Sequence, residues 1–165
     1  MRYFTPELHV QLQNPRDQEA CDEWDRRMEQ YEAELNRRMP QFSDSVKYYL
    51  NNVRLHDALL LSMGLAGATL TITCAQDPPD TRLATLTYTL AEPPQFLREV
   101  AEPAFWSVQP EFMYDEVGLD EASGAFTHDI LLGNGWELRL KFQDLEIAWS
   151  EALWPVPVMA LPRSA

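Results

Sequence analysis

Histidine stands directly before aspartate at two places in the chain, and these pairs are the clearest candidates for chemistry. His56 and Asp57 lie in RLHDALLL, His128 and Asp129 lie in FTHDILL, and an aliphatic run follows each pair. An imidazole beside a carboxylate can hold a metal ion or act as an oriented general base. The same dipeptide can also form the polar start of a strand, so the elements around each pair decide between these interpretations.

Six short runs typical of β-strands, separated by turn residues, surround or contain the histidine pairs. They are HDALLLSM, ATLTITCA and RLATLTYTL in residues 56–90, and FMYDEVGL, AFTHDILL and WELRLKFQDLEIAW in residues 112–149. Residues 92–110 contain four prolines and are expected to form an irregular connection. The proline-rich tail from residue 151 is expected to follow the surface.

Helical periodicity is confined to residues 1–54. Asn14 and Pro15 have the form of a helix N-cap and first turn, and apolar residues then recur every three or four positions until Pro40. A second, shorter helix is expected to begin at Ser43 or Asp44. The pattern predicts a single α+β domain over residues 1–165, in which two N-terminal helices pack on an antiparallel sheet or partly closed sandwich of about six strands. Its parts are a helical segment (1–54), a β-rich body (55–150) and the tail (151–165).

The loop Gly133-Asn134-Gly135 sets a register for the last two strands. A three-residue loop with Gly135 left-handed puts His128 on an apolar face and Asp129 on the opposite, polar face, whereas a two-residue loop would mix the faces. The predicted pairs are Leu132 with Trp136, Ile130 with Leu138, His128 with Leu140, Phe126 with Phe142, Leu131 with Glu137, Asp129 with Arg139 and Thr127 with Lys141. Adjacent strand residues cannot line one pocket, so each His-Asp pair supplies at most one inward group, and His128 is expected in the core.

Metal chemistry would require His56 and His128 to converge with carboxylates such as Asp115 or Glu116. Two imidazoles and a carboxylate suit zinc or iron, which makes a metal-assisted hydrolase one alternative. The sequence has no HExxH motif, no GxSxG motif and no phosphate-binding glycine loop followed by a helix, so no catalytic residue, metal site or cofactor is predicted. The possible polar site therefore comprises only His56, Asp57 and His128.

Negative charge is concentrated in the second part of the chain. The net charge is −13, and residues 92–121 hold eight acidic residues against Arg98 alone. Such a surface repels nucleic acid and attracts a basic protein. Aromatic residues are interleaved with the acids, and the predicted partner-binding residues are Phe105, Trp106, Glu111, Tyr114, Asp115 and Glu116.

The cysteine pattern predicts reduced thiols, and the short apolar runs predict no membrane span. Cys21 and Cys74 form no CxxC motif, and we expect two reduced, mostly buried thiols. No apolar stretch approaches the ~20 residues that a membrane span needs, and no signal-peptide pattern opens the chain. We expect no membrane partner and, for a bacterial protein, a cytoplasmic location.

Several segments resemble a bacterial family of uncharacterised proteins with an N-terminal helical segment and a β-rich body. They are MRYFTPELHVQLQNP, LHDALLL, FMYDEV and FTHDILLGNGWELRLKFQDLEI. The chain is also similar in style to small immunity-type proteins encoded beside bacterial toxins, whose helix-plus-sheet body binds and blocks the toxin. The resemblance implies a fold and a binding role, and it carries over no catalytic residue.

The leading functional hypothesis is a non-enzymatic, acidic protein-binding module, immunity-like in style, with a basic protein as partner. The alternatives are the metal-assisted hydrolase and a homo-oligomeric structural protein with the Trp106 and Trp154 regions at its interface.

Overall fold

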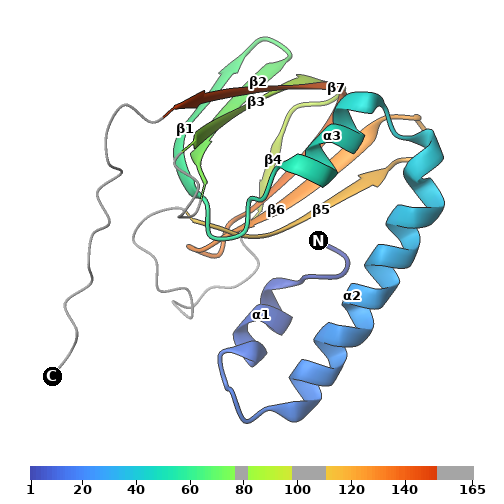
Figure 1. Cartoon of the computed structure of the whole chain (residues 1–165), viewed down its shortest axis with the longest axis vertical. Helices are drawn as coiled ribbons and strands as arrows, with labels where there is room; N and C mark the ends of the chain where they lie inside the picture. The colour runs from blue at the N-terminus through green and yellow to red at the C-terminus, as the bar shows by residue number, and fades with distance from the viewer. Residues whose placement is uncertain (77–81, 98–110, 152–165) are drawn as a thin grey trace, which may run out of the picture.

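The computed structural model describes residues 1–76, 82–97 and 111–151 (Figure 1). The proline-rich tail beyond residue 151 lies outside these ranges, and so do Phe105, Trp106 and Trp154. The elements, in chain order, are α1 (Pro6–Leu12), α2 (Gln18–Arg38), the short 3-10 helix η1 (Met39–Gln41), α3 (Asp44–Asn52), β1 (Leu59–Ala66), β2 (Thr69–Ala75), β3 (Arg82–Leu90), β4 (Gln95–Leu97), β5 (Phe112–Leu119), β6 (Phe126–Leu132) and β7 (Glu137–Glu151).

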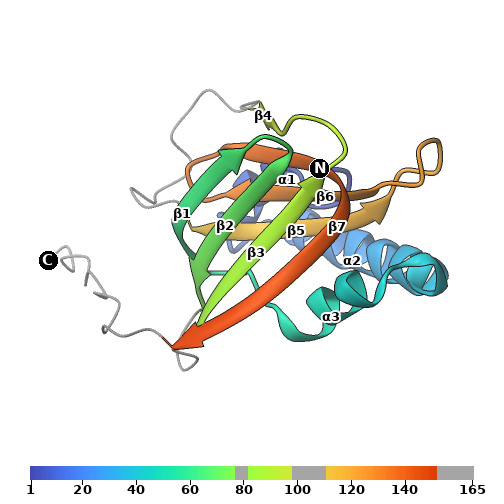
Figure 2. The same ribbon diagram turned by 90° about the horizontal axis from the view of Figure 1, so that it is seen from above.

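The strands form one antiparallel sheet in the order β1-β2-β3-β7-β6-β5, and β4 also pairs with β7. The first part of β7 pairs with β6 and β4, and its second part pairs with β3, so this long strand joins two halves of a curled sheet (Figure 2). A bridge between Leu59 and Glu111 brings the two outer strands together at one end. The predicted α+β fold with helices on a partly closed antiparallel sheet is confirmed.

The predicted register of β6 and β7 is confirmed. His128 lies opposite Leu140, and Asp129 lies opposite Arg139. Gly135 has a φ of 82°, the left-handed conformation that the three-residue loop requires. Residues 92–97 depart from the expected irregular connection, because Gln95–Leu97 adds the short strand β4 beside β7.

The start of the long helix differs from the prediction. Asp17, rather than Asn14, caps α2, with its carboxylate accepting a hydrogen bond from the Ala20 amide at 3.0 Å. Asn14 lies in the turn after α1, a helix that Thr5 caps and that the sequence pattern did not separate. Of the two residues expected to cap α3, Ser43 and Asp44, the structure has Ser43 as the cap. None of the helices in the described ranges is long and apolar enough to cross a membrane.

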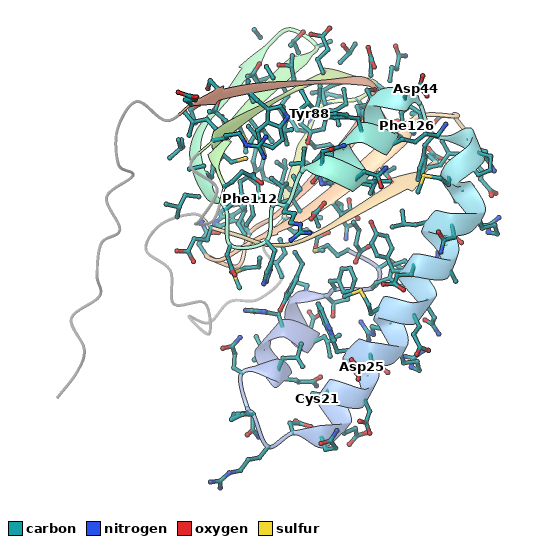
Figure 3. All side chains as sticks on the ribbon, viewed as in Figure 1. Cys21, Asp25, Asp44, Tyr88, Phe112 and Phe126 are labelled. Atoms are coloured by element: carbon teal, nitrogen blue, oxygen red, sulfur yellow. The ribbon has the colours of Figure 1, made fainter. Side chains whose placement is uncertain are left out.

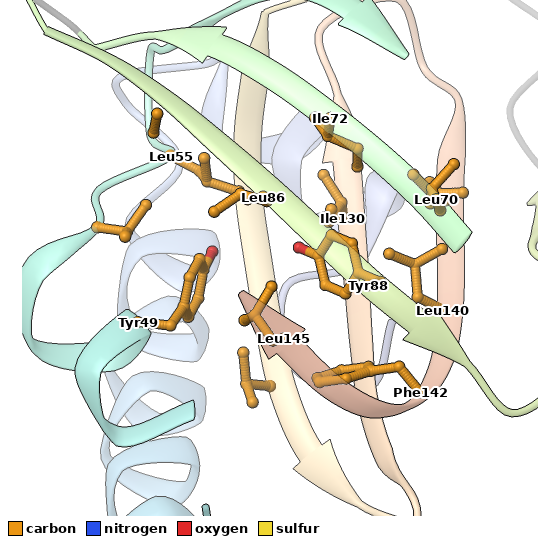
Figure 4. Packing of buried hydrophobic residues seen from close by; sticks show 14 of the residues in the cluster. Tyr49, Leu55, Leu70, Ile72, Leu86, Tyr88, Ile130, Leu140, Phe142 and Leu145 are labelled. Carbon is orange, nitrogen blue, oxygen red and sulfur yellow. The ribbon is translucent and has the colours of Figure 1, made fainter. Parts of the chain in front are cut away.

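Two apolar clusters lie on opposite faces of β5. The larger fills the curl of the sheet beneath α3, where Tyr49, Tyr88 and Phe142 pack with aliphatic residues from the strands (Figure 4). The smaller joins Tyr3 and Phe4 to α2 on the other face of β5. In Figure 3, Tyr88, Phe112 and Phe126 lie within the sheet body, whereas Cys21 and Asp25 lie on the part of α2 that extends away from it.

The two thiols are expected to differ sharply in reactivity. Cys74 is fully buried in the larger cluster, and burial raises its pKa to about 11, while Cys21 is only half-buried. Because the thiolate is the reactive species, Cys21 should react with a disulfide reagent at pH 8 while Cys74 reacts at least about 100-fold more slowly until the protein unfolds. Thiol titration of the native protein checks this, with Cys21→Ser to assign the fast phase. Equal rates for both thiols would contradict the buried position of Cys74.

Candidate functional site

His128 lies at the centre of a buried polar cluster inside the sheet. Its Nδ1 lies 2.9 Å from the Tyr88 hydroxyl, and its Nε2 lies 3.0 Å from Asp115 Oδ2 and 3.3 Å from the Tyr49 hydroxyl. Tyr49 also donates a hydrogen bond to Asp115 Oδ2 at 2.7 Å. The four side chains come from α3, β3, β5 and β6, and in Figure 4 the hydroxyl ends of Tyr49 and Tyr88 point toward each other across the core.

One assignment of donors and acceptors satisfies every member of this cluster. The Tyr49 hydroxyl donates to Asp115, and His128 Nε2 donates to the same carboxylate. The Tyr88 hydroxyl donates to His128 Nδ1. Burial and the nearby Asp115 carboxylate hold the pKa of both tyrosine hydroxyls well above the usual value, so both remain donors. The histidine nitrogens are thus occupied by protein groups, which is the arrangement of a structural buried network.

His56 and Asp57 lie outside the core, in a turn before β1, rather than within the strand. The turn is closed by a hydrogen bond from the Ala58 amide to the Leu55 carbonyl at 2.8 Å, and Asp57 has a positive φ of 61°. The His56 ring stacks on Tyr114 with 5.4 Å between ring centroids, and its Nε2 lies 3.4 Å from Asp57 Oδ2. This histidine–aspartate pair is mostly exposed.

Strand alternation keeps the two histidines apart. Tyr114 and Asp115 are neighbours on β5 and point to opposite faces, so His56 contacts the outer face through Tyr114 while His128 contacts the inner face through Asp115. The convergence that the hydrolase alternative needs is therefore not formed. No group of three or more potential ligands suited to a metal ion occurs within residues 1–76, 82–97 and 111–151.

His9, the third histidine, adds pH dependence on the outer face of β5. Its buried ring lies 5.4 Å from the Tyr114 ring, and burial, followed by the charge of His56, lowers its pKa from the ordinary 6.5. Unfolding lets this ring take up a proton more readily, so its contribution to stability is present above pH 6.5 and is lost as the pH falls below it.

We expect His56→Gln to raise the pKa of His9, because it removes the repelling charge, and His9→Gln to weaken the loss of stability below pH 6.5. Histidine titration by NMR and urea unfolding at several pH values measure the two effects. A His9 pKa at or above 6.5 in the parent protein would contradict this account.

The acidic residues proposed for partner binding are mostly used inside the molecule. Glu116 is 7% exposed and accepts backbone hydrogen bonds from Arg2, Tyr3 and Phe4 at 2.6–2.8 Å. Asp115 belongs to the His128 cluster. These two carboxylates therefore do not form the exposed acidic surface that the sequence indicated, because the N-terminal segment and α3 cover the two faces of β5.

Of the remaining candidates, Tyr114 and Glu111 lie in the described residues, at different places. Tyr114 packs among Phe4, His9, Trp24 and His56. Glu111 is half-buried at its bridge with Leu59, and Phe105 and Trp106 lie in the part of the chain that the structure does not describe.

A surface that the sequence pattern did not single out lies along β1. This strand is at the edge of the sheet, and its only ladder partner among the described strands is β2. Leu61 and Leu65 are 48% and 55% exposed. Residues 58–76, which include β1 and β2, contain no charged side chain in a chain with a net charge of −13. This run without charged residues was the feature of the sequence that could have indicated the apolar surface along β1.

Comparison of the chain with models of known protein families and with curated protein sequences gave no match.

Proposed function

We propose that the protein is a non-enzymatic protein-binding module that binds an extended polypeptide segment along the edge of β1. The observation that carries the proposal is the combination of a strand edge that pairs with no other described strand, exposed leucines and a run without charged side chains. Backbone groups on a sheet edge bind an added strand through ladder hydrogen bonds, and neighbouring apolar side chains supply contact area.

Edge strands of soluble proteins usually carry protection against this kind of pairing. Lysine, proline and β-bulges are the common devices. β1 has a register shift at Leu61, but the part from Ser62 to Ala66 pairs regularly with β2 and contains neither lysine nor proline. Over residues 62–66, and within the described residues, the edge carries none of these devices, which supports a binding role.

The contacts of the candidate catalytic groups also favour binding over catalysis. Tyr88, Asp115 and Tyr49 occupy the hydrogen-bonding positions of His128, and His56 stacks on Tyr114 on the other face of β5. The contacts of these side chains hold strands and helices together. An immunity-type role, in which a binding surface blocks a toxin, is one form that such a module takes.

Gly64 offers a matched pair of variants for testing the surface. A Cβ added there meets no atom within 4 Å, and the backbone is outside the left-handed region, so neither a clash at Cβ nor backbone strain opposes the substitution. Gly64→Lys places a charge on the strand edge, whereas Gly64→Thr adds an uncharged residue that suits a strand.

The test is a selection of peptides from a random display library against dilute, immobilised protein, at a density where copies do not meet. We expect extended apolar peptides that protect the amides of β1 from hydrogen exchange and bind Gly64→Lys at least about tenfold more weakly than Gly64→Thr. Selected peptides that bind both variants equally and protect another region would overturn the proposal.

A further inference from the structure

We propose that the segment that occupies the edge of β1 is β1 of a second copy of this chain, so that the two sheets continue into each other across a twofold axis. This inference rests on the proposed function and names its partner. It follows from three features of β1: the position of its regular part, the order of its side chains and its charge.

The regular, unbridged part of β1 runs from Ser62 to Ala66. Leu59 is used in the bridge to Glu111, and the register shift occurs at Leu61. Gly64 is the centre of this part. Two such strands that run antiparallel with full overlap therefore place Gly64 opposite Gly64 of the second copy, Met63 opposite Leu65, and Ser62 opposite Ala66.

This register matches side chains on both faces. Met63 and Leu65 lie opposite Ile72 and Leu70 of β2, whose side chains are buried, so they belong to the core face of the sheet. In the paired strands each half-exposed Leu65 meets Met63 of the second copy, which extends the apolar layer. The other face carries Ser62, Gly64 and Ala66, which are small and uncharged, so no like charges meet there.

Charge also favours a second copy at this edge over one at the acidic surfaces of the molecule. Two molecules that each carry a net charge of −13 repel each other at long range. At the hairpin of β1 and β2 the two molecules can approach without opposing two charged side chains of that hairpin, because residues 58–76 have none. Salt screens the remaining repulsion, so dimerisation should strengthen as ionic strength rises. Binding of a basic partner to the acidic protein would instead weaken as ionic strength rises.

Sedimentation equilibrium of the full chain tests the inference over a range of protein and salt concentrations. We expect a dimer for the parent and for Gly64→Thr, with a dissociation constant that falls as salt is added. Gly64→Lys and Gly64→Glu should each raise that constant at least about tenfold, because like charges then face each other across the axis. An equimolar mixture of these two variants should dimerise again, because the opposed charges attract. Circular dichroism and thermal unfolding of each variant confirm that the monomer is folded.

Three results would overturn the second copy as the partner. The parent chain could stay monomeric at every concentration while selected peptides still bind β1, which would leave the proposed function intact. Gly64→Glu could associate normally with a protein partner that Gly64→Lys does not bind, which would identify a basic partner. A dimer that tolerates both charges would use another surface. If selected peptides also failed to bind β1, the proposed function itself would be wrong.

Discussion

Replacing Glu116 with alanine is expected to lower the free energy of unfolding by about 3–5 kcal/mol. The carboxylate accepts hydrogen bonds from the amides of Arg2, Tyr3 and Phe4, and its side chain is almost fully buried. Alanine leaves these donors without an acceptor at the place where the N-terminal segment joins β5. Urea unfolding measures the loss, and the fluorescence of Trp24, which packs on Phe4, reports whether the segment detaches.

Two variants serve as controls for Glu116→Ala. Glu116→Gln keeps the length and one acceptor oxygen, so it should lose about half as much stability. Glu29→Ala removes an exposed carboxylate from α2 and should change the free energy of unfolding by less than about 0.5 kcal/mol. A loss below about 1 kcal/mol for Glu116→Ala would mean that the N-terminal segment is not held as described.

Replacing His128 with alanine is expected to cost about 2–4 kcal/mol of stability. The change removes a fully buried ring, leaves the Tyr88 hydroxyl without its hydrogen-bond partner and leaves Asp115 with the hydrogen bond from Tyr49 alone among the contacts of this cluster. Thr127, its neighbour on β6, points to the other face, and Thr127→Ala should cost less than about 0.5 kcal/mol. Chemical unfolding of the two variants and of Tyr88→Phe, which removes only one hydroxyl, separates the packing of the ring from its hydrogen bonds. Equal small losses for His128→Ala and Thr127→Ala would contradict the inward position of His128.

The strands could be predicted because their side chains alternate. The bounds of β3 and β5 agree with the segments RLATLTYTL and FMYDEVGL, and the register of β6 and β7 followed from the faces of the two strands and a glycine at the left-handed position. The sequence also narrowed the cap of α3 to Ser43 or Asp44, and Ser43 is the cap. These features depend on contacts between residues that are close in sequence.

The sequence-based predictions failed mainly where segments far apart in the sequence come into contact. Glu116 appeared to be a surface carboxylate because its partners are backbone amides more than 100 residues away, which no side-chain pattern encodes. Asn14 resembled a helix cap, but the chain turns once more before Asp17 takes that role. The exposed edge of β1 depends on the order of the strands, and a list of strands does not specify that order.

Hydrogen exchange at β1 tests the central claim, that the edge of this strand is the binding surface, most directly. The amides of Leu60–Ala66 that point away from β2 should exchange rapidly in dilute parent protein and become protected as the protein concentration rises. In Gly64→Lys they should stay unprotected over the same range, while the amides of β3 and β7 exchange equally slowly in both proteins. Exchange at β1 that remains rapid at every concentration and in the presence of the selected peptides would contradict the account.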